Sequence, residues 1–89
     1  MVWRVLYRPE ALRELRKLDR AIARRIVRFV DERLVKCADP RAFGQALHGP
    51  ELGRYWKYRI GGYRAIVEIR DREILILIVR IGDRKDVYR

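Results

Sequence analysis

Three apolar runs in the second half of the chain, at residues 54–60, 63–70 and 73–81, constrain the fold more than any other feature. A Gly-Gly pair at 61–62 separates the first two runs, and glycine supplies the positive φ that a two-residue hairpin turn requires. An Asp-Arg pair at 71–72 predicts a second turn. Short runs rich in β-branched and aromatic residues, joined by such turns, are typical of strands. The second half therefore predicts an antiparallel three-stranded meander.

The first half of the chain predicts a short strand followed by two helices. Residues 2–7 alternate and include β-branched and aromatic side chains, which indicates the strand. Apolar residues at helical spacing predict a helix over about 10–18 and a second that begins after Asp19 and ends near Lys36. The stretch 38–53 is rich in Pro and Gly and predicts a connecting loop with one helical turn. We expect an α+β fold in which the two helices pack as an α-hairpin on one face of the sheet.

The chain is strongly basic. It has 22 Lys and Arg against 12 Asp and Glu, a formal net charge of +10 over 89 residues that we expect to form a single domain, 1–89. Such an imbalance attracts polyanions whatever their sequence, so a nucleic acid or an acidic protein is the expected partner, although a merely well-solvated basic surface has the same composition. The single Cys37 excludes an intrachain disulfide and favours a reducing, cytoplasmic location. No apolar run is long enough to span a membrane.

Three basic residues fall on one face of the predicted hairpin. A two-residue turn at 61–62 places Arg59 directly opposite Arg64, and the alternation of side chains along a strand adds Lys57 to the same face. The apolar residues of the two strands share the other face, which helices would cover. Like charges opposite each other destabilise a sheet, which indicates that an anion lies between the two arginines. The alternative is an ion-pair network with the nearby acidic residues, Glu68, Asp83 and Asp86.

Two further residues extend this basic surface beyond the third strand. Arg84 follows Gly82, whose backbone can approach a ligand closely, and Tyr88 either packs on the sheet or stacks on a base. No cluster of His, Cys and carboxylate has metal-ligand spacing, and the chain contains no Ser or Thr to act as a nucleophile. We therefore expect no metal and no cofactor, and any chemistry must use Lys, Arg and Tyr.

Four motifs and the order of the elements resemble the RelE branch of the RelE/ParE toxin superfamily. The motifs are "YRPEALRELRKLD", "DPRAFGQALHG", "YWKYRIGGYRAIVEI" and "RIGDRKDVYR", and the resemblance covers the whole chain. The hairpin and tail motifs together are its specific part. Members of this branch are toxins that cleave mRNA in the ribosomal A site without a metal. The resemblance implies the same fold and activity, a cognate antitoxin, and a toxin–antitoxin hetero-oligomer.

The resemblance also implies which residues are catalytic. In the branch, cationic side chains orient the phosphodiester so that the 2′-hydroxyl attacks the neighbouring phosphorus and leaves a 2′,3′-cyclic phosphate. The positions that match are Lys57, Arg59, Arg64, Arg84 and Tyr88. Arginine does not readily act as a base, and neighbouring cations disfavour the charged form of a lysine, so we expect Lys57 to accept the proton. The branch can have lysine at both strand positions, whereas this chain has Arg59 at the second, which leaves the identity of the base open.

Two other functions remain as alternatives at this point. A ParE-like toxin would share the fold and inhibit DNA gyrase without being an enzyme, but that branch lacks the complete Lys, Arg, Arg and Tyr set. A basic RNA-binding module would bind RNA without cleaving it. Loss of cleavage with retained binding, on mutation of Lys57, would separate an enzyme from a module.

Overall fold

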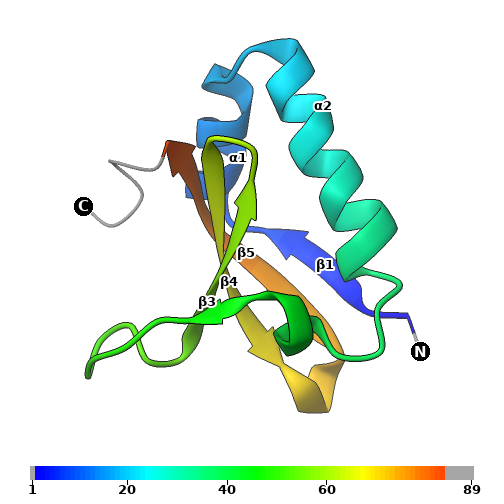
Figure 1. The fold of residues 1–89 in the computed structure, drawn as a ribbon, viewed down its shortest axis with the longest axis vertical. Helices are drawn as coiled ribbons and strands as arrows, with labels where there is room; N and C mark the ends of the chain where they lie inside the picture. Colours follow the sequence, from blue (N-terminus) through cyan, green and yellow to red (C-terminus); the bar gives the residue numbers. More distant parts are fainter. Residues whose placement is uncertain (1, 84–89) are drawn as a thin grey trace.

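The computed structural model describes residues 2–83. Its elements in chain order are β1 (Arg4–Tyr7), α1 (Pro9–Lys17), α2 (Arg20–Phe29), the π-helical turn η1 (Val30–Leu34), the 3₁₀ turn η2 (Pro40–Phe43), β2 (Gln45–Ala46), β3 (Tyr55–Ile60), β4 (Tyr63–Arg70), the 3₁₀ turn η3 (Asp71–Glu73) and β5 (Leu75–Asp83). Both helices lie on one side of a strongly twisted sheet (Figure 1). The predicted α+β class, with two helices on one sheet face, is confirmed.

The sheet has five strands in the order β1-β5-β4-β3-β2. The strands β3, β4 and β5 form the predicted antiparallel meander, and Gly61, with φ = 63°, begins the turn between β3 and β4. The N-terminal strand β1 pairs in parallel with β5, with Val5 opposite Ile76. The short strand β2 pairs with β3. The whole sheet is therefore mixed, because a parallel neighbour and an outer strand are added to the meander.

Two connections differ from the predicted ones. The stretch 38–53 contains β2 as well as the expected helical turn, because Gln45 and Ala46 pair with the edge of β3. The turn between β4 and β5 is longer than the Asp-Arg pair at 71–72, since no glycine is present there to supply positive φ. Instead, η3 ends at Ile74 in the left-handed conformation, with φ = 50°. The carbonyl of Ile74 accepts a hydrogen bond from the N–H of Arg4 at 2.8 Å, which joins this turn to β1.

The core lies between the helices and the inner face of the sheet. Its buried side chains come from the residue before β1, both helices, η1, β3, β4 and β5, namely Trp3, Ala11, Ile26, Val30, Leu34, Tyr58, Ile60, Ala65, Val67, Ile76, Ile78 and Ile81. The second helix was predicted to continue to about Lys36, and it does so through η1, where the N–H of Val35 donates to the carbonyl of Val30 at 3.0 Å. The wider π turn was not predicted. It keeps both Val30 and Leu34 fully buried.

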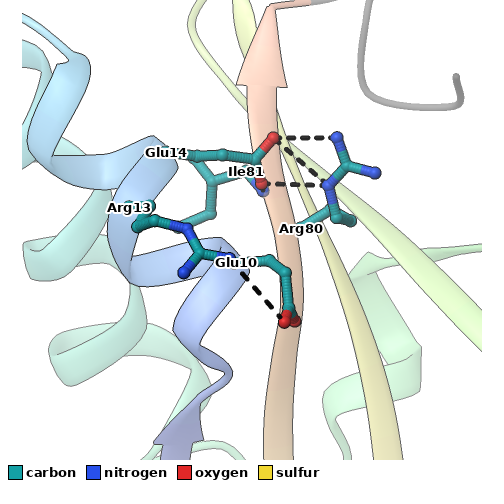
Figure 2. Close-up of polar contacts among 5 residues, drawn as sticks. All are labelled: Glu10, Arg13, Glu14, Arg80 and Ile81. Atoms are coloured by element: carbon teal, nitrogen blue, oxygen red, sulfur yellow. Dashed lines mark hydrogen bonds and ion pairs between the residues drawn. The ribbon is translucent and has the colours of Figure 1, made fainter.

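A carboxylate of α1 takes the place of a strand partner for β5. The strand β1 pairs with β5 only as far as Ile78, so beyond that point the edge of β5 needs another acceptor. The N–H of Ile81 donates to Glu14 Oε1 at 2.9 Å, while Nε and Nη2 of Arg80 donate to the same carboxylate at 3.0 and 2.9 Å (Figure 2). Burial by itself raises the pKa of Glu14, but these hydrogen bonds outweigh it and lower the pKa from its ordinary value of 4.5. Glu14 therefore connects α1 to the sheet.

Candidate functional site

The β3–β4 hairpin places three of the predicted site residues together. Arg59 lies directly opposite Arg64, and Lys57 lies opposite Ile66, as the two-residue turn predicts. Tyr58, between Lys57 and Arg59, is buried in the core, so by the alternation of a strand its two basic neighbours point to the other face. The geometry that the sequence predicted for this hairpin is confirmed.

Arg64 stands out among the charged residues because it is buried. Its exposed fraction is 8%, and it is the sole charged residue classed as buried within residues 2–83. Its guanidinium has no hydrogen bond or ion pair to another residue of that part of the chain. Arg64 also lines a hollow at the hairpin turn, from which an anion can reach its positive charge. The exposed Arg59 opposite it presents a second positive charge to the same anion.

The structure shows the partners of only some of the acidic residues that could neutralise this hairpin. Glu68 binds Arg70 on its own strand, with 2.5 Å between Oε2 and Nε, rather than the three basic residues of the hairpin. Arg70 also approaches Glu73 at 3.7 Å. Asp86 lies outside the described residues, as do Arg84 and Tyr88. Glu68 therefore does not form the ion-pair network that was the alternative reading of these charges.

Three hollows meet at Arg59. The first, which we call the edge cavity, has a volume of about 170 Å³ and is lined by Phe29, Arg33, Phe43, Gln45, Lys57 and Arg59. A groove of about 310 Å³ extends from it along α2 and is lined by Arg25, Arg28, Phe29, Glu32, Arg33, Arg59, Ile60 and Gly61. A smaller hollow of about 90 Å³ lies at the hairpin turn, lined by Arg59, Gly61, Gly62, Tyr63 and Arg64. Arg59 lines all three, so it links the hairpin turn to the edge of β3 and to α2.

Aromatic rings support the wall of the edge cavity. The guanidinium carbon of Arg33 lies 5.0 Å from the ring centroid of Phe43 and 5.4 Å from that of Phe29, which is within the range of cation–π attraction. The two phenylalanine rings meet edge to face with their centroids 6.1 Å apart, and Tyr58 packs against both. The hydroxyl of Tyr58 donates to the carbonyl of Pro40 at 2.5 Å. The wall is thus fixed from behind by the core.

The sequence analysis did not identify Phe29, Arg33, Phe43 or Gln45 as site residues. Phe29 and Arg33 belong to the end of α2 and to η1, and the other two belong to η2 and β2, so the cavity depends on contacts between distant segments. Their residue types have no spacing that would have indicated a shared site. Among residues 2–83, no group of three His, Cys, Asp or Glu side chains is arranged to hold a metal ion. In that same range, no helix has the length and apolar composition that crossing a membrane requires.

Two helices on one face of a five-stranded sheet, with a cluster of cations on the β3–β4 hairpin, define the chain as a small basic α+β protein. The chain belongs to the family described as the ParE toxin of the type II toxin–antitoxin system parDE, whose model matches residues 5–88. It is 33% identical over 91 residues to a protein of Escherichia coli described as a RelE-like toxin, covering 99% of this chain and 92% of that protein.

Two further matches, both from Mycobacterium tuberculosis, show the same relationship. The toxin RelG of Mycobacterium tuberculosis is 32% identical over 89 residues, covering 100% of this chain and 99% of that one. A chain in the crystal structure of the toxin–antitoxin complex RelBE2 from the same organism superposes with a TM-score of 0.85 at 29% identity, covering 97% of this chain and 95% of that chain. The protein is therefore a toxin of the RelE/ParE superfamily, as the resemblance implied.

Proposed function

We propose that this toxin is a metal-independent endoribonuclease that cleaves mRNA in the ribosomal A site. The observation that supports this most directly is the placement of Arg64, which has no ion pair within residues 2–83, directly opposite Arg59. A phosphodiester bound between the two arginines would supply the missing negative charge. In the transition state more negative charge gathers on the phosphoryl oxygens, so fixed guanidinium groups stabilise it more than the ground state.

The reaction transfers one proton at each end of the scissile bond. The 2′-oxygen forms a bond to phosphorus as its proton passes to the amine of Lys57, the P–O5′ bond breaks, and the departing 5′-oxygen takes up a proton from water. Lys57 precedes Arg59 by two residues on β3 and lines the edge cavity with it, which supports its role as base. Arg59 and Arg64 hold the phosphate. In this proposal Arg84 neutralises the leaving oxygen and Tyr88 contacts the base or the nucleophile, and both lie outside the described residues.

A cognate antitoxin is the expected protein partner. The similar chain in the RelBE2 structure belongs to a toxin–antitoxin complex, and the family model is that of a type II toxin–antitoxin system. We propose that this chain forms a hetero-oligomer with an antitoxin in the cytoplasm, and that the antitoxin blocks or distorts the basic hairpin. Acidic residues in its docking segment would complement the net charge of +10.

A second candidate function is inhibition of DNA gyrase without catalysis, because the matching family model is described as a ParE toxin. The placement of Arg64 opposite Arg59, with Lys57 on the same face, favours RNA cleavage over this candidate. Primer extension on mRNA after brief expression of the toxin distinguishes the two. In-frame, ribosome-dependent cuts support the nuclease, whereas intact messages together with inhibited gyrase would support the ParE-like function.

The roles of the individual cations are tested by single-turnover cleavage on saturating ribosome complexes. Lys57→Ala should slow cleavage roughly 10²–10⁴-fold, the range typical of a general base, with ribosome binding retained. Arg16→Ala, on the exposed side of α1, is the control and should cleave at the wild-type rate once bound. If Lys57→Ala also cleaves at the wild-type rate, Lys57 is not the base and the hairpin is a binding surface.

A further inference from the structure

Four residues that line the edge cavity have no role in the RNA cleavage proposed above. Lys57 and Arg59 belong to the phosphate site, whereas Phe29, Arg33, Phe43 and Gln45 do not. We propose that the edge cavity binds one base of the RNA, an adenine in first place, and that Gln45 reads its edge. This inference rests on the proposed function, since the base belongs to the RNA whose phosphate the hairpin holds.

The size of the cavity fits a single planar ring system. Its volume of about 170 Å³ is smaller than the roughly 300–1,000 Å³ of sites that enclose drug-sized ligands. A whole nucleotide does not fit, but a base can enter while its ribose and phosphate stay at the basic hairpin outside.

The guanidinium of Arg33 provides a stacking surface. Its carbon lies 5.0 and 5.4 Å from the centroids of Phe43 and Phe29, so the two rings hold one side of the cation. Bases of single-stranded RNA stack on guanidinium planes as well as on aromatic rings. Because the phenylalanine rings are already in contact with Arg33, the base would stack on the cation and not on the rings themselves.

Gln45 provides the hydrogen-bonding groups that discriminate between bases. It lies directly opposite Lys57 in the β2–β3 pairing, its side chain is exposed, and it lines the cavity. A carboxamide has both a donor and an acceptor, and it pairs in a bidentate way with N6 and N7 of adenine. Lysine and arginine, with donors only, cannot make that pair. Gln45 is thus the residue in the cavity suited to selecting adenine.

The backbone next to Gln45 is held in place by the core. A Cβ at Gly44 would lie 2.8 Å from ring carbons of Tyr58, so the chain passes the ring more closely than any other residue would allow. The same ring is hydrogen-bonded to Pro40 at the start of η2. A fixed backbone keeps the carboxamide in one position, which is a requirement for recognition of a base edge.

The chain offers a specific spectroscopic probe for this inference. Gln45 is its sole glutamine and the sequence contains no asparagine, so the labelled protein has one pair of side-chain carboxamide NMR signals. The four nucleoside 5′-monophosphates and ribose 5-phosphate are titrated separately into the ¹⁵N-labelled toxin. The Gln45 side-chain signals should move most with adenosine monophosphate and stay in place with ribose 5-phosphate.

Substitutions then test the role of Gln45 directly, with the backbone amides of β2 as the reporter. Gln45→Ala should weaken binding of adenosine monophosphate roughly 5- to 150-fold, the loss of one bidentate pair, and leave binding of ribose 5-phosphate unchanged. His48→Ala, in the same connection but outside the cavity, is the matched control and should bind like the wild type. Equal shifts with all five ligands, or the same affinity in Gln45→Ala, would overturn the inference.

The titration needs neither a ribosome nor cleavage, so its failure is separable from that of the proposed function. Cleavage of mRNA by a toxin whose Gln45 responds to no base would refute the base site and leave the nuclease standing. Base-selective binding by a toxin that leaves mRNA intact would refute the nuclease and leave the base site standing.

Discussion

Replacement of Glu14 should show how much the free energy of unfolding depends on a side chain that accepts a hydrogen bond from the edge of β5. In Glu14→Ala the N–H of Ile81 loses its acceptor, and Ile81 is only 1% exposed, so little water can replace the carboxylate. An unsatisfied buried donor costs about 1–3 kcal/mol. The ion pair with Arg80 adds at most about 1 kcal/mol, because both side chains are partly exposed, at 36% and 26%. We expect a loss of about 2 kcal/mol, most of it from the orphaned backbone group.

Thermal unfolding followed by circular dichroism measures this loss. A loss of about 2 kcal/mol should lower the Tm by roughly 8–16 °C in a chain of this size. Glu14→Gln keeps an acceptor for Ile81 and should lose less than about 1 kcal/mol. Glu10→Gln is the control, because the carboxylate of Glu10 lies in an exposed pair with Arg13 at 4.0 Å (Figure 2). The reasoning is refuted if Glu14→Gln is as unstable as Glu14→Ala, or if Glu14→Ala melts like the wild type.

The pH dependence of stability follows from the same carboxylate. The pKa of Glu14 is lowered in the folded protein, so its contribution to the free energy of unfolding is fully present above the ordinary value of 4.5. That contribution falls as the pH drops below 4.5 and passes through the folded-state pKa. Denaturant titrations between neutral and acidic pH should therefore show a smaller acid loss in Glu14→Gln than in the wild type. If both proteins lose the same free energy of unfolding in acid, Glu14 is not the cause of that loss.

Three further outcomes test other parts of the structure. Gly44→Ala should cost about 1–3 kcal/mol by urea denaturation, because its Cβ would meet the ring of Tyr58 at 2.8 Å, whereas Gly62→Ala, with nothing within 4 Å, should change stability little. Arg64→Met should change the Tm little while it reduces RNA cleavage, since methionine keeps the apolar stem of the side chain and Arg64 has no ion pair within residues 2–83; a large drop in Tm would indicate a structural role instead. The affinity for the antitoxin should fall as salt rises, by calorimetry, and a salt-independent affinity would exclude a docking surface built on the basic hairpin.

The meander and its register were predictable because each depends on local chemistry. The glycine pair at 61–62 determines which residues of β3 and β4 face each other, and the alternation of Tyr58 with Lys57 and Arg59 then assigns the faces. The pairing of β1 with β5, the short strand β2 and the π turn were not predictable in this way. The first joins the two ends of the described chain, the second pairs across a loop, and no local pattern in the sequence indicates either pairing or the π turn.

In the candidate site, too, only the part that depends on local chemistry was predictable. The basic residues on β3 and β4 followed from the hairpin, whereas Arg84 and Tyr88 followed from the family resemblance and lie outside the described residues. The edge cavity was missed because its wall comes from the end of α2, from η1 and from η2. Arg33 in particular resembles any exposed helical arginine in the sequence. Only the structure shows that its guanidinium lies over the rings of Phe29 and Phe43.

The place of β5 in the sheet determines the order in which the newly made chain can fold. Among the described elements β5 is synthesised last, yet it lies inside the sheet, between β1 and β4 (Figure 1). Until residues 75–83 emerge from the ribosome, β1 has no strand to pair with, and the core lacks Ile76, Ile78 and Ile81. Contacts that join such distant parts of a chain form slowly, because a long loop must close first. A nascent toxin therefore cannot complete its sheet or its core until β5 has been made.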